Sequence, residues 1–411
     1  MVIKFIKISK YISDHINVIL AAKLSHILII PSWYPNQLHN KGSFVEDQAR
    51  ALANSGSKIV VFLFEMIRPF DRAVIKWKKE EALEYIDVKF RNWIPTRLSA
   101  ALLNFQKNLV LNKIGSSLKK YIKLHGKPDI IHLHSIVEYG YVTKYLSERF
   151  NIPYVLTEHY PFEAVSYDPI FNAYETMANL NDLVLNAKSR ISVSPHYQRL
   201  YSDKFNCEFN TIPNLIPMFF SKQEKKEAKR NGKFIFLSVG ALIARKGHAL
   251  LIRAFAKAFG GESEYVLQIV GSGKLYDELI TLPQHLDIEG QVNFLGTLGR
   301  EAIVDEFDRC RVSVVSSSHE TFSIVVIESL IRGKPVISTK CGGPESLINE
   351  TNGLLCENGS EDDLCAKMTE IVKRYDDFDE KTIVQDALEK YSEEVVTAKI
   401  QKVYTRVLAS I

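Results

Sequence analysis

The stretch VSVVSSSHETFSIVVIESLIRGKPVIST (312–339) contains one complete strand–loop–helix–strand unit. Residues 312–318 and 335–339 are short runs rich in valine and isoleucine, which is typical of buried strands. Between them, HETF is expected to be a loop, and residues 324–332 are expected to form a short helix that Gly333 ends. Strands that are joined through a helix run parallel, so this unit predicts an α/β fold.

The same alternation of strand and helix recurs along the chain. We expect strands at 25–33, 58–64, 129–135, 153–159 and 190–195, and again at 234–240, 265–271, 292–296, 312–318 and 335–339. We expect helices at 44–56, 137–150, 247–259, 301–310 and 324–332. Because the strand runs are apolar on both faces, they indicate parallel strands buried beneath helices.

A charged stretch at 221–233 interrupts this alternation and is the predicted linker. The sequence therefore predicts two Rossmann-like, doubly wound parallel-sheet domains, 1–215 and 216–392, that face a central cleft. The final helix, within 393–411, is expected to pack back on the first domain. Sheets of this kind bind ligands beyond the carboxyl ends of their strands, so the residues that follow each strand are the candidates for a site.

The composition is that of a globular protein, with 46% hydrophobic and 24% charged residues among 411. No stretch reaches the roughly 18 to 20 apolar residues that a membrane-spanning helix needs. The first 22 residues are apolar but carry Lys4, Lys7 and Lys10, which fits either an ordinary N-terminal helix or a basic segment that contacts a membrane surface. The five cysteines include no CxxC pair, which indicates reduced thiols in a cytosolic protein and no zinc site.

Charge is unevenly divided between the two halves. Residues 1–215 hold 27 Lys and Arg against 19 Asp and Glu, a balance of +8, and residues 216–411 hold 25 against 29, a balance of −4. A basic first half suits an anionic partner or a membrane face, although a solvated surface explains it equally well. The sequence resembles no nucleic-acid-binding module.

Two acids, Glu320 and Glu328, lie eight positions apart in the unit at 312–339. Glu320 falls in the expected loop and Glu328 about one turn inside the helix, so both can border one ligand. Ser323 is the expected N-cap, and the free amides of 323–325 at the start of the helix would attract a phosphate. Glu328 could accept hydrogen bonds from ribose hydroxyls, while Glu320 could contact a sugar or face positive charge at a reacting carbon. The alternative is structural: one acid opposes the helix dipole and the other is buried and bonded to backbone.

Two cations, Arg245 and Lys246, follow the strand at 234–240. They could clamp a diphosphate leaving group, or they could form a solvated pair on the surface. In the first half, Gly42 and Ser43 precede the helix at 44–56 and provide a second helix start that can bind an anion.

Three of the histidines that lie in the predicted strands of the first half bear on the site. His159 follows Glu158 at the end of 153–159, where a ligand contact and a structural role are both plausible. His132 and His134 are expected to point to opposite faces of the strand 129–135, which argues against a shared metal ion.

Taken in order, these motifs resemble those of the retaining nucleotide-sugar glycosyltransferases of family 4 (glycosyl transferases group 1), which have the GT-B fold. The most specific element is E-x7-E, from Glu320 to Glu328. The motifs around it are VGALIARKG (239–247), IVGSG (269–273), VNFLG (292–296), GGPESL (342–347) and NGLLCENG (352–359). In addition, SWYP (32–35) with KGSFVEDQARALANSG (41–56) is similar to the glycine loop and helix of relatives that build bacterial polysaccharides. The resemblance covers nearly the whole chain from residue 25.

The resemblance implies a role for each matching position. Glu328 would bind the ribose hydroxyls of the donor, and Glu320 would contact its sugar ring. His159 would lie near the reacting side of the sugar, and Gly42 would let the first domain close on the phosphates. The donor diphosphate is assigned to the amides of Phe322, Ser323 and Ile324 and to the side chains of Arg245 and Lys246.

The chain departs from the family pattern at two places. Many relatives carry Arg directly after the glycine that is Gly240 here, whereas this chain has Ala241. Arg245 either replaces that cation or leaves its place empty. The hinge motif, similar to IPNGVD in relatives, reads IPNLIP (212–217).

The resemblance implies a retaining hexosyltransferase that transfers a sugar from a UDP- or GDP-sugar to a glycan or lipid-linked acceptor, in cell-surface polysaccharide biosynthesis. It implies no cofactor and no metal ion. The alternative GT-A fold uses an Asp-x-Asp metal site, and Asp377 and Asp379 have that spacing but are expected to be solvated on a charged helix end. Two alternatives share the architecture: a sugar-nucleotide epimerase and a non-catalytic sugar-nucleotide-binding scaffold.

We expect a cytoplasmic protein with peripheral contact at the inner face of the membrane. The acceptor surface is expected within 65–127, where Trp77, Trp93 and several lysines could meet a lipid-linked acceptor.

Overall fold

The structure is a computed structural model that describes residues 25–35, 42–67, 74–91, 100–159, 161, 177–225 and 232–411. The basic N-terminal segment (1–22) and Trp93 lie outside these residues, as does part of the predicted linker. The chain divides into two compact units. The first comprises the described residues up to Val193, with Gln198–Ile212 and Val396–Ile411, and the second comprises Ser194–Tyr197 and Pro213–Val395. Compared with the predicted division, 194–197, 213–215 and 393–395 belong to the second unit.

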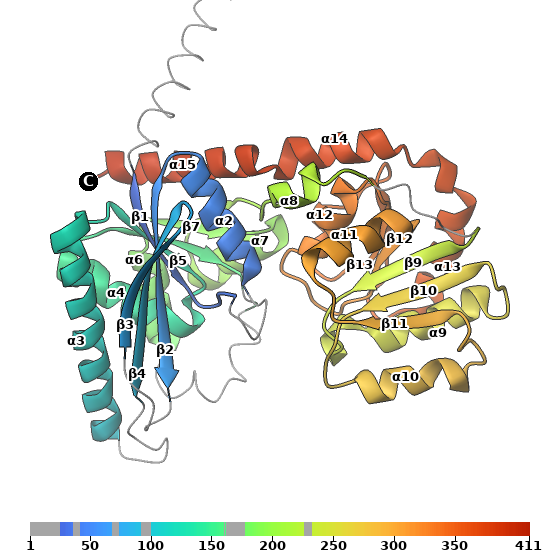
Figure 1. The fold of residues 1–411 in the computed structure, drawn as a ribbon, viewed down its shortest axis with the longest axis horizontal. Helices are drawn as coiled ribbons and strands as arrows, with labels where there is room; N and C mark the ends of the chain where they lie inside the picture. Colours follow the sequence, from blue (N-terminus) through green and yellow to red (C-terminus); the bar gives the residue numbers. More distant parts are fainter. Residues whose placement is uncertain are drawn as a thin grey trace, which may run out of the picture. The chain divides into compact units, whose positions relative to one another are not determined.

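The first unit is built on one sheet, in which the described strands have the order β3-β4-β2-β1-β5-β6-β7-β8 (Figure 1). The strands are β1 (His26–Pro31), β2 (Lys58–Ile67), β3 (Val74–Glu80), β4 (Leu83–Arg91), β5 (Ile130–His134), β6 (Tyr154–Glu158), β7 (Ser189–Ser192) and β8 (Asn210–Thr211). Neighbouring strands are parallel, except that β3 pairs antiparallel with β4. His134 pairs with Thr157, so β5 and β6 end at the same edge of the sheet.

Helices cover both faces of this sheet. They are α2 (Ser43–Asn54), α3 (Ala100–His125), α4 (Ile136–Phe150), α6 (Met177–Asn186), α7 (Pro195–Phe205) and α15 (Glu393–Ala409). The helices α3, α4 and α6 lie on one face, and α2 and the end of α15 lie on the other (Figure 1). Because both faces are covered, residues 27–30 of β1 are fully buried, as their apolar run predicts.

The second unit contains a sheet whose described strands are all parallel, in the order β11-β10-β9-β12-β13-β14. The strands are β9 (Phe234–Val239), β10 (Tyr265–Val270), β11 (Val292–Gly296), β12 (Val312–Val315), β13 (Val336–Thr339) and β14 (Gly353–Cys356). The helices are α8 (Met218–Lys222), α9 (His248–Phe259), α10 (Tyr276–His285), α11 (Arg300–Arg309), α12 (Ile324–Ile331), α13 (Glu361–Lys373) and α14 (Glu380–Tyr391), with short 3-10 turns η2 (Ala244–Lys246), η3 (Pro344–Ser346) and η4 (Tyr375–Asp377).

An apolar core fills one side of the second sheet, where α9, α10 and α13 pack on the strands through residues such as Phe255, Leu279 and Met368. The helices α11, α12 and α14 lie on the other side (Figure 1). Each predicted strand and helix overlaps an observed element, and the predicted α/β class is confirmed. Elements without a matching prediction include the β3–β4 pair and the long helix α3 in the first unit, and α10, α13 and α14 in the second. The five cysteines are free, as expected.

In the part of the chain that the structure describes, no helix combines the length and the apolar character needed to span a bilayer.

Candidate functional site

The start of α12 is held in an unusual backbone conformation. Ser323 precedes the helix with φ 76° and ψ 84°, and its hydroxyl makes no capping hydrogen bond, so the predicted N-cap position is correct but the predicted cap is absent. Among the described residues, none accepts a hydrogen bond from the amides of Phe322, Ser323 or Ile324. Unpaired amides at a helix start are donors for an anionic ligand.

Glu320 lies beside this helix start and forms ion pairs with two cationic side chains. The Nζ atom of Lys246 is 2.6 Å from Oε1 of Glu320, and Ser317 Oγ donates to the same oxygen at 2.7 Å. The Nη1 atom of Arg245 is 3.7 Å from Oε2 and donates to the carbonyl oxygen of His319 at 2.8 Å. Because the Glu320 side chain is only 8% exposed, its charge is balanced locally by these partners.

The loop that carries Glu320 is fixed by the segment after β13. The amide of Glu320 donates to the carbonyl oxygen of Cys341 at 2.8 Å, and the amide of Gly343 donates to the carbonyl oxygen of Glu320 at 2.7 Å. A Cβ atom at Gly343 would lie 2.5 Å from the Cα atom of Phe322, so only glycine fits there. The GGPESL motif therefore holds the loop at the start of α12 in place.

The opposite end of α12 is anchored by a buried ion pair that was not predicted from the sequence. Arg332 donates to both carboxylate oxygens of Asp308 in α11, at 2.9 and 2.8 Å, and to the carbonyl oxygens of Phe220 and Gln223. Glu328 lies one turn inside α12 and is partly buried. Its position relative to the helix start is thus set by a helix that is held at both ends.

In the first unit, Gly42 and His159 lie close together. Gly42 precedes α2 with φ 79°, and a Cβ atom there would lie 2.3 Å from the carbonyl oxygen of Trp33. Two residues later, the ring of Phe44 packs on the ring of His159 at 4.7 Å. The start of α2 and the end of β6 therefore form one cluster.

Glu158 has a structural role in this cluster. It is fully buried and accepts hydrogen bonds from Ser135 Oγ at 2.7 Å, from the amide of Ile136 at 3.0 Å and from the amide of His159 at 2.9 Å. It thereby caps α4 and fixes the backbone of His159. Burial lowers the pKa of His159 to about 3, so its ring is neutral at physiological pH.

The prediction that His132 and His134 point to opposite faces is wrong. Their ring centroids are 4.3 Å apart, because positions i and i+2 of a strand lie on the same face. His134 Nδ1 is 3.0 Å from His159 Nε2, and His132 bonds to Thr157 Oγ1 and to the hydroxyl of Tyr404 in α15. Within the described residues, no group of three or more His, Cys, Asp and Glu is arranged to hold a metal ion.

The two acids of the Asp-x-Asp pair, Asp377 and Asp379, each interact with a neighbouring residue of the chain. Asp379 caps α14 by accepting from the amide and the hydroxyl of Thr382, at 2.9 and 2.6 Å. Asp377 pairs with Arg374 at 3.3 Å.

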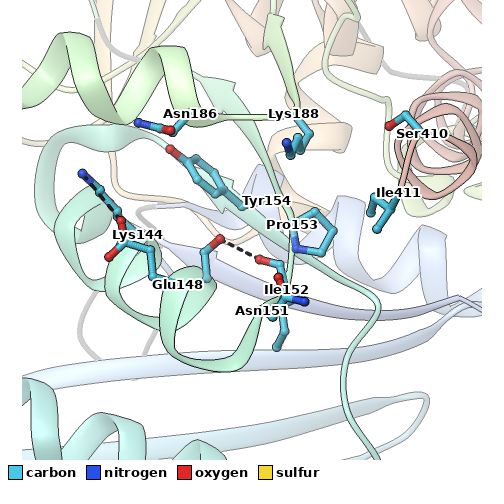
Figure 2. Close-up of a pocket in the computed structure, with 11 residues that line it drawn as sticks. Lys144, Glu148, Asn151, Ile152, Pro153, Tyr154, Asn186, Lys188, Ser410 and Ile411 are labelled. Atoms are coloured by element: carbon cyan, nitrogen blue, oxygen red, sulfur yellow. Dashed lines mark hydrogen bonds and ion pairs between the residues drawn. The ribbon is translucent and has the colours of Figure 1, made fainter.

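A cavity of about 350 Å³ lies at the other end of β6, where Tyr154 begins the strand (Figure 2). Its polar lining includes Lys144, Glu148, Asn186 and Lys188. No predicted site residue lines it.

The structure thus brings the predicted residues together in two groups. The second unit combines Arg245, Lys246 and Glu320 with the start of α12, and the first unit combines Gly42 with His159. Two family models match the chain in corresponding parts: "Glycosyltransferase Family 4" over residues 42–218 and "Glycosyl transferases group 1" over residues 219–388. The chain belongs to glycosyltransferase family 4.

Known relatives agree with this membership. A glycosyltransferase of Methanocaldococcus jannaschii is 26% identical over 358 residues, which is 83% of this chain and 92% of the relative. The Campylobacter jejuni N-acetylgalactosamine-N,N'-diacetylbacillosaminyl-diphospho-undecaprenol 4-alpha-N-acetylgalactosaminyltransferase is 34% identical over 189 residues, covering 45% of this chain and 46% of the relative. The crystal structure of Anabaena HepE in complex with UDP has a TM-score of 0.66 at 17% identity and covers 94% of this chain and all of HepE. The two Rossmann-like units are those of the GT-B fold, as predicted.

Proposed function

We propose that this protein transfers a sugar from a UDP- or GDP-sugar to a glycan or lipid-linked acceptor, with retention of the anomeric configuration, in the synthesis of a cell-surface polysaccharide. The observation that carries the proposal is that Lys246 and Arg245 both contact Glu320, directly beside the amides at the start of α12, which donate to no described residue. Two cations and several amide donors around one carboxylate suit a ligand that combines a diphosphate with a neutral sugar.

Donor binding follows from the charges of this site. A diphosphate at the amides of 322–324 would meet Lys246, whose ammonium is already held by Glu320. Charge-assisted hydrogen bonds to phosphate are stronger than neutral ones, and Arg can contact two phosphate oxygens at once. Glu320 then remains beside the sugar, and Glu328 can accept hydrogen bonds from the ribose hydroxyls.

Leaving-group departure is the step that these groups assist. The bond between the anomeric carbon and the diphosphate breaks, and the negative charge that develops on the phosphate oxygen is stabilised by Lys246, Arg245 and the amides. The hydroxyl oxygen of the acceptor attacks the anomeric carbon from the same face and passes its proton to the departing phosphate oxygen, so the configuration is retained. The carboxylate of Glu320 opposes the positive charge that develops at the sugar ring.

Arg245 is proposed as the second cation of the clamp. In the family pattern an Arg directly follows the glycine that is Gly240 here, whereas this chain has Ala241 at that position. Arg245 is half exposed and lies 3.7 Å from Glu320, so it can reach the ligand that Lys246 binds.

Two relatives support the substrate classes. HepE was solved with UDP, and the Campylobacter enzyme is named for an undecaprenol-linked acceptor. In this chain, the exposed side of α3 carries Lys119, Lys120 and Lys123 together with Leu124, which is 67% exposed, and α3 contains no Asp or Glu. The indole of Trp77, 38% exposed, packs 5.8 Å from His125 at the end of the same helix. We propose that this basic face of α3 contacts an anionic membrane that carries the acceptor.

One experiment tests the proposed reaction against its alternatives. The protein is incubated with a panel of UDP- and GDP-sugars, with and without oligosaccharide and lipid-linked acceptors, in the presence of EDTA, and the products are identified by mass and by NMR. Glycosylated acceptor supports transfer, and an axial or equatorial linkage that matches the donor supports retention. An isomerised nucleotide sugar without acceptor indicates an epimerase, and binding without any product indicates a scaffold.

A further inference from the structure

Three buried histidines form a row at the edge of the first sheet where β5 and β6 end. His132 is fully satisfied, since Nδ1 is 2.6 Å from the hydroxyl of Tyr404 and Nε2 is 2.7 Å from Thr157 Oγ1. His134 and His159 are nearly parallel, with ring centroids 5.3 Å apart and planes inclined by 14°. Their hydrogen bond joins Nδ1 of His134 to Nε2 of His159 at 3.0 Å.

The surroundings of the second ring nitrogen of His134, Nε2, determine which of the two rings donates this hydrogen bond. Nε2 of His134 is buried, and no described residue forms a hydrogen bond with it. Burial lowers the pKa of both rings, that of His159 to about 3, so each ring is neutral and carries a single N–H. Only one proton can therefore lie between the two rings.

Two arrangements satisfy this condition. If His159 donates from Nε2, then His134 must carry its own proton on the buried Nε2, where no described residue accepts it. If His134 donates from Nδ1, then its Nε2 is a bare lone pair. A buried N–H without an acceptor is rarer in proteins than an acceptor without a donor. The second arrangement is therefore favoured, and it leaves the proton of His159 on Nδ1.

We propose that His134 is a positioning residue that fixes His159 in the tautomer with its proton on Nδ1. The ring of His159 is also held by Phe44 on one side and through its backbone by Glu158, so Nδ1–H keeps one direction. His159 then acts as a hydrogen-bond donor to a substrate oxygen and does not act as a general base. The catalytic part of this inference rests on the proposed transferase function, whereas the tautomer does not.

The tautomer can be read directly by NMR. In the full chain labelled with ¹⁵N-histidine, long-range ¹H–¹⁵N correlations show which ring nitrogen carries the proton, and His159→Gln identifies the signals of His159. We expect Nδ1–H for His159 in the wild type and in His134→Asn, because the amide nitrogen of Asn can donate from the position of Nδ1. We expect Nε2–H or a doubly protonated ring in His134→Asp, whose carboxylate only accepts. A wild-type His159 that carries its proton on Nε2 would overturn the proposal.

Measurements of turnover then show whether His134 positions the ring of His159 or only packs against it. His134→Asn should keep most of the transferase activity, and His134→Asp should lose at least about tenfold in kcat with little change in KM, as expected for a wrong tautomer. Equal losses in both variants would contradict the positioning role. If no transfer is found at all, the proposed function fails while the NMR result still tests the tautomer.

Discussion

The Nζ atom of Lys246 lies 2.6 Å from Oε1 of Glu320, so the two residues that motif order assigns to the leaving group and to the sugar are in direct contact. Without a ligand, the ammonium of Lys246 and the carboxylate of Glu320 form an ion pair that is partly buried. A diphosphate donor would give Lys246 a second anionic partner and leave Glu320 next to the sugar. Because the two residues are assigned different roles, mutation of each one should affect a different quantity: nucleotide affinity for Lys246 and turnover for Glu320.

Lys246→Ala should weaken the binding of UDP or GDP. Loss of one charged hydrogen bond costs about 1.5 to 3 kcal/mol of binding free energy, which corresponds to a roughly 10- to 150-fold rise in Kd. Isothermal titration calorimetry measures it. Lys340→Ala is the matched control, because Lys340 also pairs with a glutamate, Glu357, on the second unit. Equal affinities for wild type and Lys246→Ala would remove Lys246 from the donor site.

Glu320→Gln should reduce turnover without weakening the binding of the nucleotide. The amide keeps the size of the side chain but removes the negative charge that opposes charge at the sugar ring, so kcat should fall by about 100-fold. Lys246 loses its competing carboxylate, so the Kd for UDP or GDP should stay the same or decrease. Steady-state kinetics and calorimetry on the same preparation measure both. A normal kcat excludes Glu320 from catalysis.

Glu328→Ala should affect the nucleoside part of the donor and spare the phosphates. The carboxylate is assigned to the ribose hydroxyls, so the affinity for UDP or GDP should fall by roughly tenfold or more. Inorganic pyrophosphate, which has no ribose, should bind the variant and the wild type equally in a competition assay. An equal loss of affinity for the nucleotide and for pyrophosphate would show that Glu328 supports the loop before α12 and does not bind the ribose.

Gly42→Ala should destabilise the protein. The residue has φ 79°, and the added Cβ would lie 2.3 Å from the carbonyl oxygen of Trp33. The left-handed conformation alone costs about 1 to 2 kcal/mol for a residue with a side chain. Gly299 is the matched control, since it also precedes a helix but has φ −71° and open space around it. Differential scanning calorimetry should show a lower Tm for Gly42→Ala and little change for Gly299→Ala; equal shifts would contradict the steric account.

Replacing Lys119, Lys120 and Lys123 together by Glu should weaken binding to anionic vesicles by at least about tenfold, because each basic residue near such a surface contributes on the order of 1 kcal/mol. Co-sedimentation with phosphatidylglycerol vesicles measures it, with phosphatidylcholine vesicles as the uncharged comparison. The control variant reverses three exposed lysines of the second unit, Lys274, Lys381 and Lys390. If both triple variants lose the same affinity, the basic face of α3 is not the contact.

The sequence predicted the parallel strands well because their residues are buried on both faces and therefore form uninterrupted apolar runs. The edge of the first sheet was missed for the opposite reason. Residues 75–80 of β3 are exposed and rich in lysine, as is usual for an edge strand, so they lack the pattern of a buried strand. The following helix α3 was missed with it.

The site was predictable where residues follow one another in a motif, as do Glu320, Ser323 and Glu328. Contacts across strands were not predictable, because they depend on register. The bond between His134 and His159 follows from the pairing of β5 with β6, and Tyr404 reaches His132 from α15 at the far end of the chain. The order of motifs cannot show that Glu320 bonds to Lys246, since both were assigned to a ligand.

The central claim is that the start of α12, with Lys246, holds the donor diphosphate. A crystal structure of the protein with UDP or GDP tests it most directly. We expect both phosphates within hydrogen-bond distance of the amides of 322–324 and of Lys246 Nζ, with the ribose at Glu328. A nucleotide bound elsewhere, with Lys246 still paired to Glu320 and those amides unoccupied, would contradict it.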